Sequence, residues 1–351
     1  MEGDKSIAIP SKQIGNYVLT THFLGRGQFG EVVLAHPQKS DRQKVLMACK
    51  IIKKSRLTKK MQQNLRNEIG ILSRIESTNV IQLYDIQKTP NNFYLFMQFC
   101  NGGDLEHLLR ERERFSEQEA RFILSQILAG FRALSKMKVM HRDLKLANIL
   151  VHFRNADERM ALHEPAKFKE FKKTTELVGN VDIVIADLGF AKKIGEHELA
   201  QTKCGTPLTM APEVLQGARY NHKADVWSLG TIFYEMLTGF PPFMGRDQRD
   251  LQDNLKKGFY NFPKHIKLSL EGFDFLNCCL QYDPQNRMAW DELLRHGYAN
   301  EKEASPENDG LYLSYNPDSG NYQALVQDRP QFNMNEHNAT LINTRNPQYF
   351  E

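Results

Sequence analysis

Three glycines, Gly25, Gly27 and Gly30, stand in the pattern G-x-G-x-x-G near the start of this 351-residue chain, and Val32 completes the run. Glycine lets the backbone approach phosphate oxygens because it has no Cβ in the way. A dinucleotide-binding fold would have a helix directly after the glycines, with the pyrophosphate on its N-terminus. The strand-like run 32–35 follows instead, and it favours a β-turn that covers nucleotide phosphates. An ordinary glycine hairpin is the alternative that this pattern alone leaves open.

The spacing of apolar residues changes along the chain and divides it into two unequal parts. From Tyr17 to about Tyr94 these residues form short strand-like runs. One helix interrupts the runs, with apolar residues spaced by three and four: Met61, Leu65, Ile69, Leu72 and Ile75. From Leu105 onward the spacing is helical, and Ser116 and Glu119 match a capping box. The pattern predicts an α+β protein with a small β-rich part and a larger α-rich part.

A lysine within an apolar strand needs a negatively charged partner. Lys50 lies in the apolar run 45–52, where burial of its charge is costly without an anion. Glu68 falls on the inward face of the next helix, so we expect it to pair with Lys50. The pair would hold the lysine against the α- and β-phosphates of a nucleotide. A side chain that reaches out to solvent is the alternative reading of Lys50.

Three further motifs follow in order. The run from His141 to Asn148 reads H-R-D-L-K-L-A-N, Asp187 begins D-L-G, and Ala211 begins A-P-E. Together with the glycine run and Lys50, they resemble the signature of the eukaryotic protein kinases. The resemblance covers about residues 15–298 and implies a bilobal fold with the active site between the lobes.

The resemblance assigns a role to each polar residue of these motifs. Phosphoryl transfer needs an in-line nucleophile and neutralisation of charge on the transferred group. Asp143 would accept the proton of the attacking hydroxyl, and Lys145 would contact the γ-phosphate of ATP. Asn148 and Asp187 offer oxygen ligands, which suit Mg²⁺. Leu188 departs from the commoner phenylalanine, but we expect it to fill the same apolar space under the helix that bears Glu68.

The segment between the two lobes resembles a kinase hinge. Met97 would be the gatekeeper, and the Gln98 carbonyl and the Cys100 amide would bond the adenine. Asp104 could reach the ribose, and Ala48 joins the residues expected to contact the nucleotide.

Thr202 stands where kinases of this kind carry an activating phosphate, added by an upstream kinase or by autophosphorylation between copies. Arg142 and Lys192 could pair with that phosphate. Two structural anchors are also expected from the resemblance. Asp225 would brace the catalytic loop, and Glu213 would pair with Arg287.

Several motifs, including Q-F-C-N-G-G-D-L at 98–105, resemble the ULK-type, autophagy-initiating serine/threonine kinases. Within the kinase resemblance, Thr206 and Lys145 point to serine and threonine residues of proteins as the expected substrates. A pseudokinase that binds nucleotide or a partner as a scaffold is the alternative. The presence of Lys50, Glu68, Asp143, Asn148 and Asp187 favours an active enzyme.

The remaining segments lie outside or within this unit. We expect a flexible leader at 1–14 and the kinase domain at 15–298, with lobes at 15–97 and 105–298 and a hinge at 98–104. A polar tail follows at 299–351. An insertion at 154–180 would be a loop or short helices, and its nearly balanced charges make a solvated loop the default.

Composition limits the partners and the location. The net charge of +4 is too weak to argue for nucleic acid or an anionic membrane. No apolar run approaches the roughly 18 residues of a membrane span, so no transmembrane segment is expected. Five cysteines without ligand-like spacing indicate free thiols in a reducing compartment, which favours a cytoplasmic location.

Overall fold

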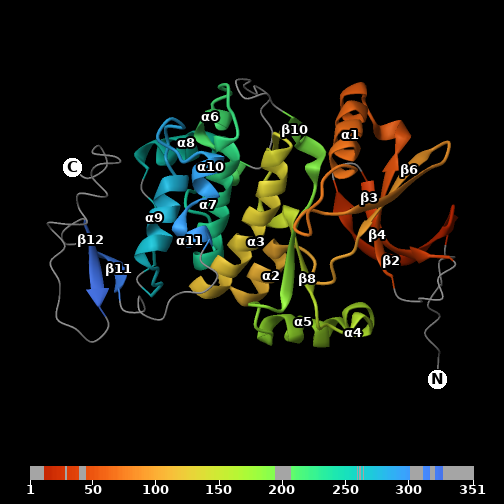
Figure 1. Ribbon diagram of the computed structural model, residues 1–351, viewed down its shortest axis with the longest axis horizontal. Helices are drawn as coiled ribbons and strands as arrows, with labels where there is room; N and C mark the ends of the chain where they lie inside the picture. Colours follow the sequence, from red (N-terminus) through yellow and green to blue (C-terminus); the bar gives the residue numbers. More distant parts are fainter. Residues whose placement is uncertain are drawn as a thin grey trace.

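Two lobes of different composition make up the protein. Figure 1 shows the strands of the first lobe on the right and the helices of the second on the left. This arrangement confirms the predicted bilobal α+β fold. The computed structural model describes these residues: 12–27, 30–38, 45–193, 207–258, 260, 262–263, 265–300, 311–316 and 321–326.

The first lobe is a six-stranded antiparallel sheet in the order β1-β2-β3-β4-β6-β5, with one long helix beside it. Helix α1 (Lys59–Leu72) begins after Thr58, whose hydroxyl accepts a hydrogen bond from the Met61 amide. The helix ends before Ile75, so the predicted helix was too long, although Ile75 is buried in the following turn. The strands are β1 (Lys12–Ile14), β2 (Tyr17–Gly27), β3 (Gly30–Pro37), β4 (Met47–Lys53), β5 (Leu83–Lys88) and β6 (Asn92–Gln98).

The second lobe is built around α3 (Glu117–Lys136) and α7 (Lys223–Thr238), whose inner faces are fully buried. The predicted capping box of Ser116 and Glu119 is confirmed at the start of α3. The other helices are α2 (Leu105–Arg112), α6 (Pro212–Leu215), α8 (Gln248–Lys257), α9 (Leu270–Cys279), α10 (Trp290–Leu293) and α11 (Gly297–Asn300). Short strands line the junction of the lobes: β7 (Val139–Met140), β8 (Ile149–Phe153), β9 (Val181–Ile185) and β10 (Lys192–Lys193).

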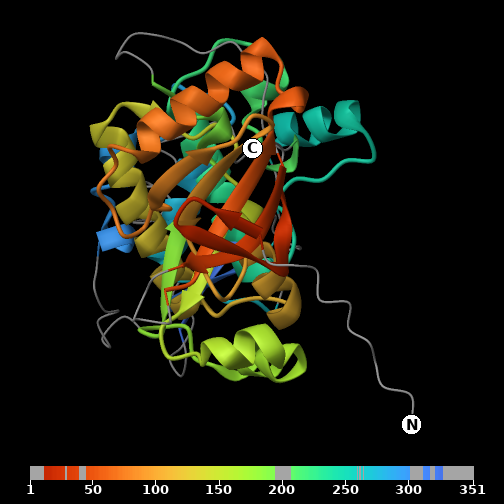
Figure 2. The ribbon, with the colours of Figure 1, turned by 90° about the vertical axis from the view of Figure 1, so that its right-hand side faces the viewer.

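The segment between β8 and β9 forms two helices, α4 (Glu158–His163) and α5 (Pro165–Thr174). Figure 2 shows them as a separate yellow-green pair below the rest of the fold. The predicted short helices are thus confirmed, and the default expectation of a solvated loop was wrong, because Phe168 and Leu177 are buried. The tail contains an unpredicted antiparallel hairpin of β11 (Leu311–Asn316) and β12 (Asn321–Val326).

Two general features concern the described part of the chain. No helix there has the length and apolar character needed to cross a membrane. Its four cysteines, Cys49, Cys100, Cys278 and Cys279, are free thiols.

Candidate active site

Lys50 and Glu68 form a buried ion pair between β4 and α1. The Nζ of Lys50 lies 2.9 Å from Oε1 of Glu68 and 3.8 Å from Oδ1 of Asp187. Burial lowers the pKa of Lys50, but the attraction of Glu68 and Asp187 outweighs burial, so the pKa of Lys50 is raised. The lysine is therefore a fixed positive charge, and the two lobes meet at its ammonium group.

Asp143, Lys145 and Asn148 lie together in the loop between β7 and β8. The Nζ of Lys145 is 3.1 Å from Oδ2 of Asp143. The side-chain amide of Asn148 donates to the main-chain oxygen of Asp143 at 2.7 Å and to its Oδ2 at 3.1 Å. These contacts hold the Asp143 carboxylate, which is buried, in one orientation.

Asp225 fixes this loop from α7. Its carboxylate accepts the main-chain N–H of His141 and that of Arg142, each at 2.9 Å. Burial raises the pKa of Asp225, and this effect outweighs the lowering by the nearby His141 and the two N–H donors. Arg142 has φ 69°, in the left-handed region that non-glycine residues rarely adopt. The expectation that Asp225 braces the loop is thus confirmed.

Strand β9 leads Asp187 into the same site. Asp187 has φ 55° and ψ 70°, a strained backbone conformation of the kind that persists at functional sites. Leu188 is fully buried in the turn that contacts α1, as expected.

No sequence pattern predicted the role of Asn79 or that of His141. The side chain of Asn79 donates to the Ile183 carbonyl at 2.8 Å, and its main-chain oxygen accepts from the Ile185 amide at 2.9 Å. His141 contacts the Ala186 carbonyl through Nε2 at 3.0 Å. Both residues hold the segment that leads from β9 to Asp187. An asparagine after a helix reads as a turn residue, so its long-range contact could not be predicted.

Strands β3, β4 and β6 bring the expected nucleotide-contacting residues together. In the strand register Val32 lies opposite Lys50, and Ala48 lies opposite Met97. A Cβ at Gly30 would lie only 1.7 Å from the Ile51 carbonyl oxygen, so packing of β3 on β4 requires glycine there. A Cβ at Gly25 would meet nothing within 4 Å.

Gly27 pairs with Gly30 where β2 and β3 meet, and the two residues between them lie outside the described residues.

The hinge residues have partners that the sequence did not predict. The Gln98 amide donates to the Gln82 carbonyl at 2.9 Å. Burial raises the pKa of the Cys100 thiol to about 12, so the thiol stays protonated at neutral pH. Asp104 caps α2 by accepting the His107 amide at 2.8 Å.

The activation segment is described only at its two ends. At the start, Nε of Arg142 donates to the Phe190 carbonyl. At the end, Arg287 forms the expected buried, two-pronged ion pair with Glu213 at 2.7 and 2.9 Å. Thr202 and the side chain of Lys192 lie outside the described residues, so the pairing of a Thr202 phosphate with Arg142 and Lys192 stays a prediction.

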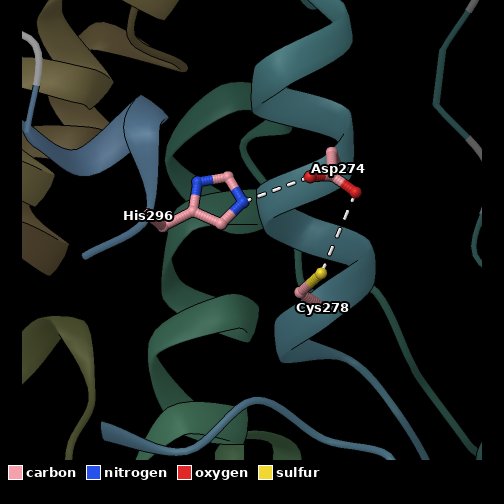
Figure 3. Close-up of side chains that lie close together, drawn as sticks. All are labelled: Asp274, Cys278 and His296. Carbon is pink, nitrogen blue, oxygen red and sulfur yellow. Dashed lines mark hydrogen bonds and ion pairs between the residues drawn. The ribbon is translucent and has the colours of Figure 1, made fainter. Parts of the chain in front are cut away.

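One mixed cluster of potential metal ligands lies away from this site. Asp274 and Cys278 of α9 and His296 bring their ligand atoms within 4.8 Å of one another (Figure 3). The Asp274 carboxylate contacts His296 Nε2 at 3.2 Å and Cys278 Sγ at 3.9 Å. The Tyr298 amide donates to His296 Nδ1, which directs the ring proton to Nε2 and towards Asp274. Hydrogen bonding therefore accounts for this grouping without a metal.

Comparison with known proteins identifies relatives of this chain. Residues 19–299 match the model of the protein kinase domain. Serine/threonine-protein kinase ATG1c of Arabidopsis thaliana is 33% identical over 293 residues, which are 83% of this chain and 36% of that protein. Human serine/threonine-protein kinase ULK1 is 35% identical over 81% of this chain and 25% of that protein.

Myosin light chain kinase A of Dictyostelium discoideum is 33% identical over 78% of this chain and 84% of that protein. The resemblance indicated by the motifs is thus confirmed. The chain spans about a third of the length of the ATG1 relatives that it matches, at 36% and 32% for two of them.

Proposed function

The chain belongs to the protein kinase family, and from this premise we propose that it transfers the γ-phosphate of ATP to serine or threonine hydroxyls of proteins. The observation that carries the proposal is the position of Lys50, whose Nζ contacts both Glu68 of one lobe and Asp187 of the other. Phosphoryl transfer requires these groups to be in place together. A pseudokinase scaffold has no need of this arrangement.

The residues present fit a nucleotide with a divalent metal ion. Protein kinases use ATP and a divalent metal, and we assign Mg²⁺ to Asn148 and Asp187. Because the Nδ2 of Asn148 is directed at Asp143, its Oδ1 is left as a hard oxygen ligand. The space beside Gly25 would admit phosphate oxygens close to the backbone. When bound, the metal neutralises charge that develops on the transferred phosphoryl group.

The protein's own groups would bind the nucleotide and orient the attacking hydroxyl. Gln98 and Cys100 would offer main-chain groups to the adenine, Ala48 and Met97 would contact its ring, and Asp104 would bind the ribose. Lys50 holds the α- and β-phosphates, while Val32 covers the base.

Asp143 would accept the proton of the serine or threonine hydroxyl on its carboxylate. Asn148 and Lys145 both touch Oδ2 of that carboxylate, so they limit its rotation. Lys145 would also contact the γ-phosphate. The arrangement lowers the barrier by positioning and by charge, and no covalent intermediate is needed.

Regulation and cellular role follow from the family resemblance. We infer that a phosphate on Thr202, added by an upstream kinase or by another copy of this chain, is held by Arg142 and Lys192. A cytoplasmic role in the initiation of autophagy is proposed from the likeness to ATG1 and ULK1 kinases.

Phosphate transfer to a serine-containing protein tests the proposed activity. We expect transfer by the wild type and its loss in Asp187→Asn. The scaffold alternative predicts that wild type and variant are equally inert, even with Thr202 phosphorylated.

A further inference from the structure

Phe153, the last residue of β8, is enclosed by the insertion at 154–180. Its ring lies 6.3 Å from that of Phe168 and 5.5 Å from that of Phe171, both edge to face. The two rings of α5 stack on each other at 5.8 Å. Such aromatic pairs add to the stabilisation that the buried area alone provides. The insertion is therefore packed onto the strand that begins directly after Asn148.

The end of α2 holds the other side of the insertion. Arg112 donates to the carbonyls of Lys172 and Thr175 at the C-terminus of α5, where helix carbonyls lack partners within the helix. The same guanidinium binds Glu119 of α3 at 2.8 Å. The side chain of Lys172 forms an ion pair with Glu111 of α2 at 3.0 Å. Three helices are thus joined at one arginine.

The hinge completes the enclosure of Phe153. The side chain of Asn101 donates to the Phe153 carbonyl at 3.0 Å and accepts its amide at 2.8 Å. A Cβ at Gly102 would lie 2.7 Å from the Val151 carbonyl oxygen, so the hinge backbone lies directly on β8. The hinge therefore fixes the main chain of β8, and α5 fixes the side chain of its last residue, Phe153.

We propose that the insertion is a brace that positions the β8–β9 hairpin and, through it, Asn148 and Asp187 as ligands of the metal. Strand β8 begins directly after Asn148, and β9 ends two residues before Asp187. At their other ends both strands are joined to the insertion, so movement of the insertion would displace both Asn148 and Asp187. This inference rests on the proposed metal-binding role of those two residues. Arg112 acts as a positioning residue, since it touches neither ligand.

The hairpin allows the insertion to be removed cleanly. The Arg154 amide donates to the Asn180 carbonyl at 3.0 Å, which continues the register of β8 and β9. A variant that lacks residues 156–178 joins Asn155 to Gly179. An Asn-Gly pair is the favoured two-residue hairpin turn, and Gly179 already has φ 77°. We therefore expect the shortened hairpin to form.

Two variants and one control test the brace. The shortened chain removes it entirely, and Arg112→Met removes the hydrogen bonds while keeping the aliphatic stem. Arg121→Met is the control, because Arg121 also donates to a main-chain carbonyl, that of Tyr298, but away from the hairpin. Binding of the ATP analogue AMP-PNP is titrated with Mg²⁺, and amide hydrogen exchange is measured without nucleotide.

The brace predicts that the Mg²⁺ concentration for half-maximal AMP-PNP binding rises roughly 10-fold in both variants, as when groups that orient metal ligands are lost. Amide hydrogen exchange at residues 181–185 should also become faster in both variants. Arg121→Met should match the wild type in both measurements. Unchanged Mg²⁺ dependence and exchange in Arg112→Met and the shortened chain would overturn the brace. If the shortened chain does not fold, Arg112→Met decides alone. A wild type that transfers no phosphate contradicts the proposed function, whereas the exchange result still decides the brace.

Discussion

The ammonium group of Lys50 lies 2.9 Å from the carboxylate of Glu68, and both side chains are buried, at 7% and 2% exposure. Removing one partner of a buried pair costs about 3–5 kcal/mol where the other charge is left alone, but Asp187 stays 3.8 Å from Lys50. We therefore expect Glu68→Gln to lower the free energy of unfolding by about 1–3 kcal/mol, measured by urea denaturation. Glu31→Gln breaks the exposed pair with Arg26 and should cost at most about 1 kcal/mol. Equal losses in the two variants would contradict the buried pair.

Two glycines of the same run should respond differently to alanine. At Gly30 the new Cβ would clash with the Ile51 carbonyl, so we expect Gly30→Ala to lower stability by about 1–3 kcal/mol. At Gly25 the Cβ meets no protein atom, so Gly25→Ala should keep the stability of the ligand-free protein and weaken ATP binding. Thermal unfolding and calorimetric titration with ATP separate the two effects. A stable Gly30→Ala protein would show that β3 does not pack as described.

Glu235 of α7 gives the protein a specific pH dependence. Burial, and secondarily Glu106, raises its pKa from 4.5 to about 7. The folded state therefore binds a proton that the unfolded state releases, and this stabilisation is lost as pH rises through about 7. We expect Glu235→Gln to raise the melting temperature clearly at pH 8 and much less at pH 5. The control Glu76→Gln, at an exposed position, should leave the melting temperature unchanged at both pH values. An effect of Glu235→Gln that is the same at pH 5 and pH 8 would contradict the raised pKa.

Phosphorylation of Thr202 is the regulatory prediction. If Arg142 holds the phosphate, phosphatase treatment should slow the wild type, and Arg142→Ala should remove the difference between treated and untreated enzyme. Mass spectrometry of the active protein should find the phosphate on Thr202. Full activity with Thr202 unmodified would refute the prediction.

The sequence predicted local chemistry better than long-range packing. The capping box of Ser116 and Glu119 is local, and the kinase motifs fix which residues meet at Asp187. In contrast, the charges of 154–180 suggested a solvated loop, because nothing near Phe168 in the sequence reveals that Phe153 will cover it. Asn79 escaped prediction for the same reason, since its partner Ile183 lies about a hundred residues away. Ile75 fitted the helical spacing but follows the end of α1, which shows that burial alone does not extend a helix.

We propose that the carboxylate of Asp187 works with Lys50 to support phosphoryl transfer. The most direct measurement is the rate of γ-phosphate transfer from ATP to a serine-containing protein by the wild type, Asp187→Asn and Asp182→Asn. Asp182 is the matched control, because it lies on β9, the strand that leads to Asp187, and binds Arg154 instead of the site. We expect Asp187→Asn to lose roughly 10³-fold in rate, since metal-held charge contributes several kcal/mol, and Asp182→Asn to stay near the wild type. Equal rates for wild type and Asp187→Asn would contradict the account.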